Sequence, residues 1–111
     1  MNNLNGTHFL CELIRELSND RNATHYKGEA TITAIVHGEE VISSDTIDCE
    51  MVIKYDSVDI NFYWEDCGYK DYKKMGLYGQ ASSKFQNITK LSNTSFKLSD
   101  PKGAYEFTIA W

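Results

Sequence analysis

The sequence contains few of the residues that interrupt or brace a chain. Its 111 residues include one proline, two arginines and three cysteines. The cysteines are odd in number and show no CxxC or cysteine–histidine spacing, so neither a disulfide framework nor a zinc site is indicated. No apolar run approaches the ~20 residues of a membrane-spanning helix, and the first ten residues lack the pattern of a signal peptide. We therefore expect a soluble protein of the bacterial or host cell cytoplasm, without a membrane partner.

Alternation with a period of two runs through residues 46–66 and predicts two half-buried strands. If Asp56-Ser57 is a two-residue turn, the apolar face pairs Met51 with Phe62 and Cys49 with Trp64, and Tyr55 also lies on this face. The outer face then pairs Asp48 with Glu65, two like charges. Cys49 is thus expected to be a buried thiol, and Cys67, beyond the second strand, an accessible one.

The rest of the chain predicts one helix and several more strands. Thr7 is a good N-cap for a helix that runs to about Ser18, with its apolar residues at three- and four-residue spacing. Further strands are expected over residues 29–37, 77–81, 95–99 and 105–111, and residues 41–42 are expected to form either a short strand or an extended approach to the hairpin. A turn is expected at Gly38-Glu39-Glu40 and a type I turn at Asp100-Pro101-Lys102-Gly103, whereas the periodicity of residues 82–92 fits either a helical turn or a strand.

One helix followed by about six or seven strands with short connections argues against parallel βαβ units. We expect an α+β fold in a single domain over residues 1–111. The N-terminal helix packs on a curved antiparallel β-meander, which is either an open sheet or a small barrel with the helix across one mouth.

No residue pattern points to catalysis. His8, His25 and His37 have no metal-ligand spacing, and no glycine-rich phosphate loop is present. The carboxylates of residues 46–66 alternate outward on strands, where solvated side chains belong, rather than in a cleft that would raise their pKa. The sequence therefore predicts no enzyme, cofactor or metal.

The charge of −5 is unevenly distributed. Residues 29–66 carry ten carboxylates and one lysine, whereas residues 67–103 carry seven lysines and two aspartates. Such an asymmetry concerns partners and association kinetics rather than the fold. The alternative to a role in partner binding is that the acidic and basic halves lie side by side in the sheet and neutralise each other.

Residues 67–80 interleave tyrosines with lysines, which suits stacking on bases, but an acidic protein with two arginines is a poor nucleic-acid binder. Tyrosines are also anchors in protein interfaces. We therefore expect a small, acidic, non-enzymatic binding protein that inhibits or neutralises a larger protein with a basic surface, as immunity proteins and viral anti-defence proteins do. The expected partner-binding residues are Asp48, Glu50, Asp59, Tyr63, Glu65, Asp66, Tyr69 and Tyr72.

A second hypothesis is a small-molecule-binding barrel with an aromatic-lined interior. Its lining would come from Trp64, Tyr105, Phe107 and Trp111. A cavity among these rings would favour it, whereas a solid interior would remove it. The sequence does not define the partner's identity or the oligomeric state.

Overall fold

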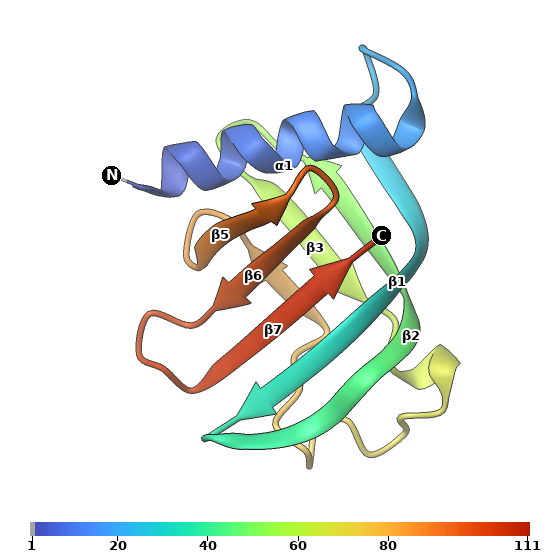
Figure 1. Ribbon diagram of the computed structural model, residues 1–111, viewed down its shortest axis with the longest axis vertical. Coiled ribbons are helices and arrows are strands. Elements are labelled where there is room, and N and C mark those ends of the chain that lie inside the picture. Colours follow the sequence, from blue (N-terminus) through green and yellow to red (C-terminus); the bar gives the residue numbers. More distant parts are fainter. Residues whose placement is uncertain (1) are drawn as a thin grey trace.

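The computed structural model describes residues 2–111, with side chains from residue 6 onward, as one helix and a single antiparallel sheet of seven strands in the order β4-β3-β2-β1-β7-β6-β5. The elements are α1 (Asn2–Ser18), β1 (His25–Val36), β2 (Glu39–Ile53), β3 (Val58–Phe62), the 3₁₀ turn η1 (Glu65–Cys67), β4 (Gln80–Ser82), β5 (Asn87–Ser92), β6 (Ser95–Ser99) and β7 (Tyr105–Ala110). The sheet curves into a half-barrel, and α1 packs across it (Figure 1). This confirms the predicted α+β fold.

Helix α1 turns its apolar stripe onto the sheet. Leu10, Leu13 and Ile14 are buried. The prediction of an N-cap at Thr7 was wrong, because the helix begins at Asn2 and Thr7 lies inside it. The Thr7 hydroxyl is instead 2.7 Å from the hydroxyl of Ser83, so it links the helix to the segment after β4.

Strands β1 and β2 form one long hairpin. Its turn is His37-Gly38, with φ of 50° and 81°, rather than the predicted Gly38-Glu39-Glu40. Positive φ at both central residues is the geometry of tight hairpin turns. The expected short strand at residues 41–42 is part of the 15-residue β2, which is locally irregular at Ser44, with φ of 51°.

The β2–β3 hairpin keeps the predicted faces but not the predicted register. Ile53 pairs with Val58 and Cys49 with Phe62, so the loop spans the four residues 54–57 and every pair is displaced by two residues. Alternation cannot detect this difference, because a two-residue shift keeps each side chain on its face. Tyr55, expected on the apolar face, lies in the loop and is fully exposed.

The core fills the space between the sheet and the helix. Met51 and Phe62 are both buried, as expected. Trp64 is also buried, but it follows β3 instead of ending it, because the chain turns there into η1. The buried aliphatic and aromatic side chains form one cluster that draws on α1 and on β1, β2, β3, β4, β6 and β7.

The second half of the chain follows the sequence analysis in part. The strand over residues 95–99 and the turn that follows it are confirmed, the turn by a 2.9 Å hydrogen bond from the Gly103 N–H to the Asp100 carbonyl. The strand expected over residues 77–81 is β4, which begins three residues later. The undecided segment 82–92 contains a strand, β5.

Candidate functional site

The predicted partner-binding residues come from three consecutive segments of the chain. β2 carries Asp48 and Glu50, and β3 carries Asp59 with Tyr63 directly after it. Glu65 and Asp66 belong to η1, and Tyr69 and Tyr72 to the turns that follow. The strand residues of this set all lie on the side of the sheet opposite the core. We call this side of β1, β2 and β3 the acidic face, and it comprises Lys27, Glu29, Asp48, Glu50, Asp59, Asn61 and Tyr63.

The like-charged pair on the acidic face differs from the predicted one. Asp48 does not face Glu65, which lies in η1. Its neighbour on β1 is Glu29, directly opposite in the β1–β2 register, and on the other side the Tyr63 N–H donates to the Asp48 carbonyl at 3.0 Å. Glu29 is exposed and Asp48 is half-buried. Like charges held opposite each other on neighbouring strands destabilise the fold.

Glu50 is held by its neighbours rather than free. Its carboxylate accepts hydrogen bonds from the Tyr63 hydroxyl at 2.7 Å and from the Asn61 amide at 3.3 Å. The hydrogen bond to Glu50 raises the pKa of Tyr63. The ammonium of Lys27, opposite Glu50 in the register, lies 4.1 Å from the centre of the Tyr63 ring. Lys27 and Glu29, which complete this face, were not among the predicted residues, because their neighbours depend on how β1 pairs with β2.

Tyr69 is turned toward its own chain. Its hydroxyl donates to the Asp45 carboxylate, and its ring makes an edge contact with Trp64 at 6.2 Å. The hydrogen bond to Asp45 raises the pKa of Tyr69 to about 12 and lowers the pKa of Asp45. The Trp64 indole N–H in turn donates to the Tyr78 carbonyl at 2.6 Å. These contacts fix the loop after η1 on β2, so Tyr69 acts in the fold whether or not it also meets a partner.

Tyr72 borders a shallow groove in the same loop. The groove has a volume of about 520 Å³ and is lined by Tyr72, Lys73, Gly76, Leu77, Tyr78, Gly79 and Gln80. The exposed Tyr78 ring packs against Tyr105 at 4.8 Å between ring centres. The predicted site is therefore divided between a flat charged face and a separate groove.

The sheet order separates only part of the basic half of the chain, β5 and β6, from the acidic half, because β4 lies next to β3 and the loop before it, which carries Lys70, Lys73 and Lys74, is held on β2 through Tyr69. β2 and β3 lie on one side of β1, whereas β5 and β6 lie on the other side, beyond β7. The ion pairs among residues 6–111 join Glu12 with Arg15, Asp56 with Lys84, and Glu106 with Lys97. Only the second joins the two halves, and no carboxylate of the acidic face takes part in any of the three. Internal neutralisation is thus limited to one end of the sheet.

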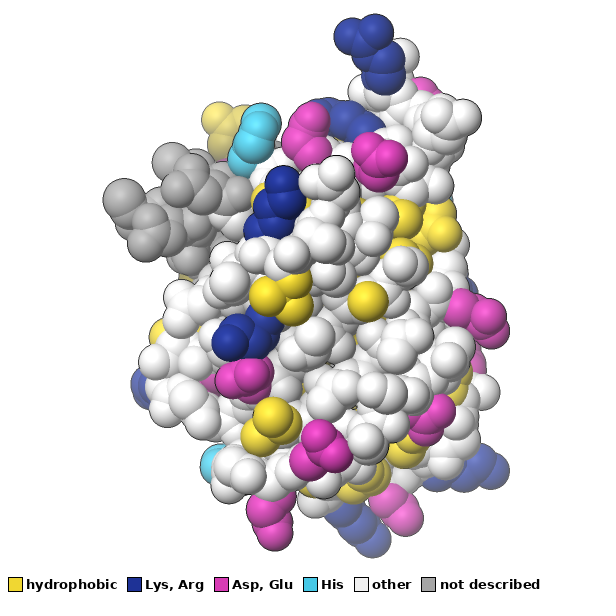
Figure 2. All heavy atoms as spheres, viewed as in Figure 1, with side chains coloured by type: hydrophobic (Ala, Val, Ile, Leu, Met, Phe, Trp, Pro, Cys, Tyr) yellow, Lys and Arg dark blue, Asp and Glu magenta, His cyan; other side chains and the backbone are white. Residues whose placement is uncertain are grey.

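The surface over β5, β6 and β7 differs from the acidic face in that it mixes charges of both signs. Figure 2 views the molecule from this side and shows basic and acidic side chains interspersed. The pair of Lys97 with Glu106, 3.7 Å apart, lies on β6 and β7. A mixed surface of this kind has no strong preference for a partner of either charge.

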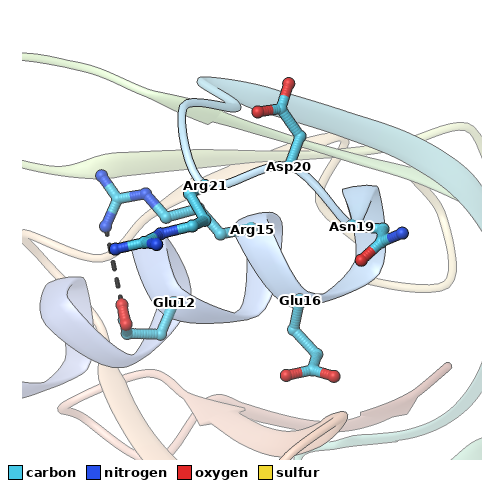
Figure 3. A pocket seen from close by; sticks show the side chains of 6 residues that line it. All are labelled: Glu12, Arg15, Glu16, Asn19, Asp20 and Arg21. Carbon is cyan, nitrogen blue, oxygen red and sulfur yellow. Dashed lines mark ion pairs between the residues drawn. The ribbon is translucent and has the colours of Figure 1, made fainter.

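A separate pocket lies at the carboxyl end of α1. It measures about 610 Å³ and is lined by Glu12, Arg15, Glu16, Asn19, Asp20 and Arg21 (Figure 3). Both arginines of the chain border it, and Arg15 forms a 3.6 Å ion pair with Glu12. Both partners are substantially exposed, so the pair contributes little. With three carboxylates against two guanidinium groups, the pocket has no clear preference for an anion.

Aromatic rings pack together where the small-molecule hypothesis needs a cavity. The Phe107 ring lies 5.8 Å from Trp64 and 4.9 Å from Tyr105, and these three residues are buried. Trp111 packs against Phe96 at 6.2 Å instead. These contacts give the small-molecule hypothesis no support.

The histidines and cysteines do not converge. Within residues 2–111, no three histidine, cysteine, aspartate or glutamate side chains are grouped as metal ligands. All three cysteines are free, with Cys49 buried and Cys11 and Cys67 half-buried. Burial strongly raises the pKa of the Cys49 thiol, which opposes thiolate chemistry there. In the described part of the chain, no helix is both long and apolar enough to cross a membrane.

Comparisons of the chain with protein families, with curated proteins and with solved structures find no match.

Proposed function

We propose that this protein is a small, acidic, non-enzymatic binding protein that inhibits or neutralises a larger protein through its acidic face. The observation that carries the proposal is the cross-strand pair of Glu29 and Asp48, neither of which forms an ion pair within residues 6–111. In the free protein the repulsion between these two carboxylates lowers the stability of the fold. In a complex with a cationic partner, the same two carboxylates would attract the partner and stabilise the complex.

The distribution of charge over the sheet supports the same function. The basic strands β5 and β6 are separated from the acidic face by β7, so a positively charged surface can approach this face without meeting the lysines of those two strands. A concentrated field of one sign accelerates encounter and makes it dependent on salt. A nuclease groove that binds nucleic acid is a surface of the required kind. This is the mode of action of an immunity protein or a viral anti-defence protein, in the cytoplasm.

The proposal is tested by capture with a matched charge variant. The wild-type protein and the double variant Glu29→Gln, Asp48→Asn are immobilised in equal amounts and exposed to extracts of the source cells at low salt. We expect a basic protein to be retained by the wild type and to associate at least tenfold more slowly with the variant.

A control variant, Glu106→Gln, removes one carboxylate from the mixed surface over β7 and should leave association unchanged. Equal association rates for wild type and double variant would contradict the proposal. So would a captured protein whose activity is the same with and without this chain bound.

A further inference from the structure

The Tyr63 ring on the acidic face already holds a cation. Tyr63 follows β3, Lys27 lies on β1, and β2 runs between them. The Lys27 ammonium nevertheless lies 4.1 Å from the centre of the ring, so the two side chains meet over β2. An ammonium at this distance from a ring centre makes a cation–π contact. The acidic face therefore contains a position at which a positive charge is stabilised.

Glu50 fixes the ring in this position. The Tyr63 hydroxyl donates to Glu50 Oε1 at 2.7 Å, and the Asn61 amide donates to the same oxygen at 3.3 Å. The second carboxylate oxygen, Oε2, receives no hydrogen bond from residues 6–111. One oxygen of Glu50 thus orients the ring, and the other remains available to a donor.

A second carboxylate borders the same position. Asp48 and Glu50 are two residues apart on β2, so their side chains leave the same face of the sheet about 7 Å apart. The Tyr63 N–H donates to the Asp48 carbonyl at 3.0 Å, so the Tyr63 side chain begins beside Asp48 and reaches Glu50. Neither carboxylate forms an ion pair within residues 6–111. The ring is therefore flanked by two carboxylates with unused acceptor oxygens.

Lys27 uses only part of this arrangement. Its ammonium contacts the ring but forms no ion pair with a carboxylate of residues 6–111. A guanidinium is planar, stacks on an aromatic face and directs its N–H groups outward in its own plane, where they can reach carboxylates on two sides. An arginine in place of the ammonium would make the stacking contact and the charge-assisted hydrogen bonds together. A lysine from outside would gain no more than Lys27 has already.

We propose that Tyr63, Glu50 and Asp48 form a binding site for an arginine side chain of the partner protein, and that this arginine displaces the Lys27 ammonium. The inference rests on the proposed function and specifies which side chain of a basic partner the acidic face selects. Because Lys27 occupies the site in the free protein, a partner must offer more than a single positive charge. Arginine is also among the residues that contribute most to protein interfaces.

An arginine tripeptide tests the site in the free protein by NMR. The probe is acetyl-Gly-Arg-Gly-amide, added to about 10 mM because a single contact of this kind gives an affinity of roughly millimolar order. In the free protein the ring should hold the Lys27 ε-methylene protons at an upfield shift. The probe should return them to the position of an exposed lysine and shift the signals of Tyr63 and Glu50.

Two matched tripeptides show what the site selects. The tripeptide with lysine in place of arginine should bind more weakly by about threefold or more, because it gains no planar set of donors. The tripeptide with citrulline, which keeps the shape of arginine without its charge, should leave the Lys27 signal unmoved. Equal binding of the arginine and lysine tripeptides, or a Lys27 signal that the arginine tripeptide does not move, would overturn the proposal.

Two lysine variants separate displacement from general attraction. Lys27→Met removes the resident ammonium and should raise the affinity for the arginine tripeptide by about threefold or more. Lys54→Met removes the same charge from the β2–β3 loop, four residues or about 13 Å along the strand from Glu50. At about 0.1 M salt this distance exceeds the screening length, so the control should leave the affinity within about 1.5-fold. Equal gains in the two variants would contradict displacement.

Substitutions at Tyr63 test the ring itself. Tyr63→Phe keeps the stacking surface but releases Glu50, so it should weaken the arginine tripeptide and keep its preference over the lysine tripeptide. Tyr63→Leu removes the ring and should abolish that preference. Amide spectra that match the wild type elsewhere in the sheet check that both variants are folded. A preference for arginine that survives in Tyr63→Leu would also overturn the proposal.

The captured partner separates this inference from the proposed function. If the partner associates with Lys27→Met and Tyr63→Leu at the wild-type rate but still depends on Glu29 and Asp48, the arginine site is wrong and the proposed function stands. If the partner does not depend on Glu29 and Asp48, the proposed function fails, whatever the tripeptides show.

Discussion

At the scale of single residues, the packing of the interior depends most on its aromatic side chains. The Phe62 ring stacks on Trp64 at 5.3 Å and meets the edge of Phe107 at 5.4 Å. Phe62→Ala removes these contacts and leaves a cavity, so we expect it to lower the free energy of unfolding by about 3–5 kcal/mol. Urea unfolding followed by tryptophan fluorescence measures this loss.

The control is Tyr55→Ala, at a fully exposed loop residue, which should change stability by less than about 0.5 kcal/mol. Alternation in the sequence alone predicts Tyr55 on the apolar face together with Phe62. Equal losses in the two variants would restore that expectation and contradict the register described here.

The hydroxyl of Tyr69 predicts a sensitivity to alkaline pH. Because the hydrogen bond to Asp45 raises the pKa of Tyr69 to about 12, the folded protein holds this proton after the unfolded chain has lost it near pH 10. The protonated Tyr69 hydroxyl therefore makes its full contribution to the free energy of unfolding below pH 10, and this contribution is lost as the pH rises from 10 toward 12. Tyr69→Phe should show a shallower fall than the wild type in urea midpoints measured over this range. Parallel pH profiles for the two proteins would remove Tyr69 as a cause.

At the scale of elements, Ser83 connects three parts of the fold. It is fully buried, and its hydroxyl accepts a hydrogen bond from the Val58 N–H at 2.9 Å and lies 2.7 Å from the Thr7 hydroxyl. Ser83→Ala leaves the buried Val58 N–H without this acceptor, which should cost about 1–3 kcal/mol. Ser43→Ala, at an exposed residue of β2, should be nearly neutral. An unchanged unfolding midpoint for Ser83→Ala would show that this link carries no stability.

The elements also show how far the sequence could be interpreted. Alternation identified the faces of β1, β2, β3, β6 and β7, because a buried face fixes which side each residue takes. It could not fix the β2–β3 register, since loops of two and four residues place the same residues inside. The helix start was missed because Thr7 has the chemistry of a cap but uses its hydroxyl on Ser83.

The candidate site was less predictable than the fold, because its neighbours come from distant segments. The sequence indicated that Asp48 would face a carboxylate, and it does, but the partner is Glu29 on β1 rather than Glu65. Tyr69 was expected to be available to a partner, and its bond to Asp45 depends on how the loop after η1 returns to β2. Contacts of this kind require the three-dimensional course of the chain.

At the scale of the whole molecule, the acidic face predicts a balance between stability and binding. The double variant Glu29→Gln, Asp48→Asn removes the repulsion between β1 and β2. The energy of a cross-strand pair of this kind is a few tenths to about 1 kcal/mol. We therefore expect the free double variant to be as stable as the wild type or slightly more so. The difference should shrink as salt screens the wild-type repulsion. A clear loss of stability at low salt would mean that the two carboxylates support the fold.

The pairing of β1 with β7 has a consequence for how the chain reaches this structure. It joins residue 31 to residue 110, so the centre of the sheet is completed by segments from opposite ends of the sequence. The hairpins on either side are local and can form early, but their union must wait until the last strand has been synthesised. Sheets dominated by such distant contacts fold in milliseconds to seconds rather than microseconds. Until then, the edges of β1 and β7 that will pair with each other are both exposed on the nascent chain. A chaperone would be needed most during this interval.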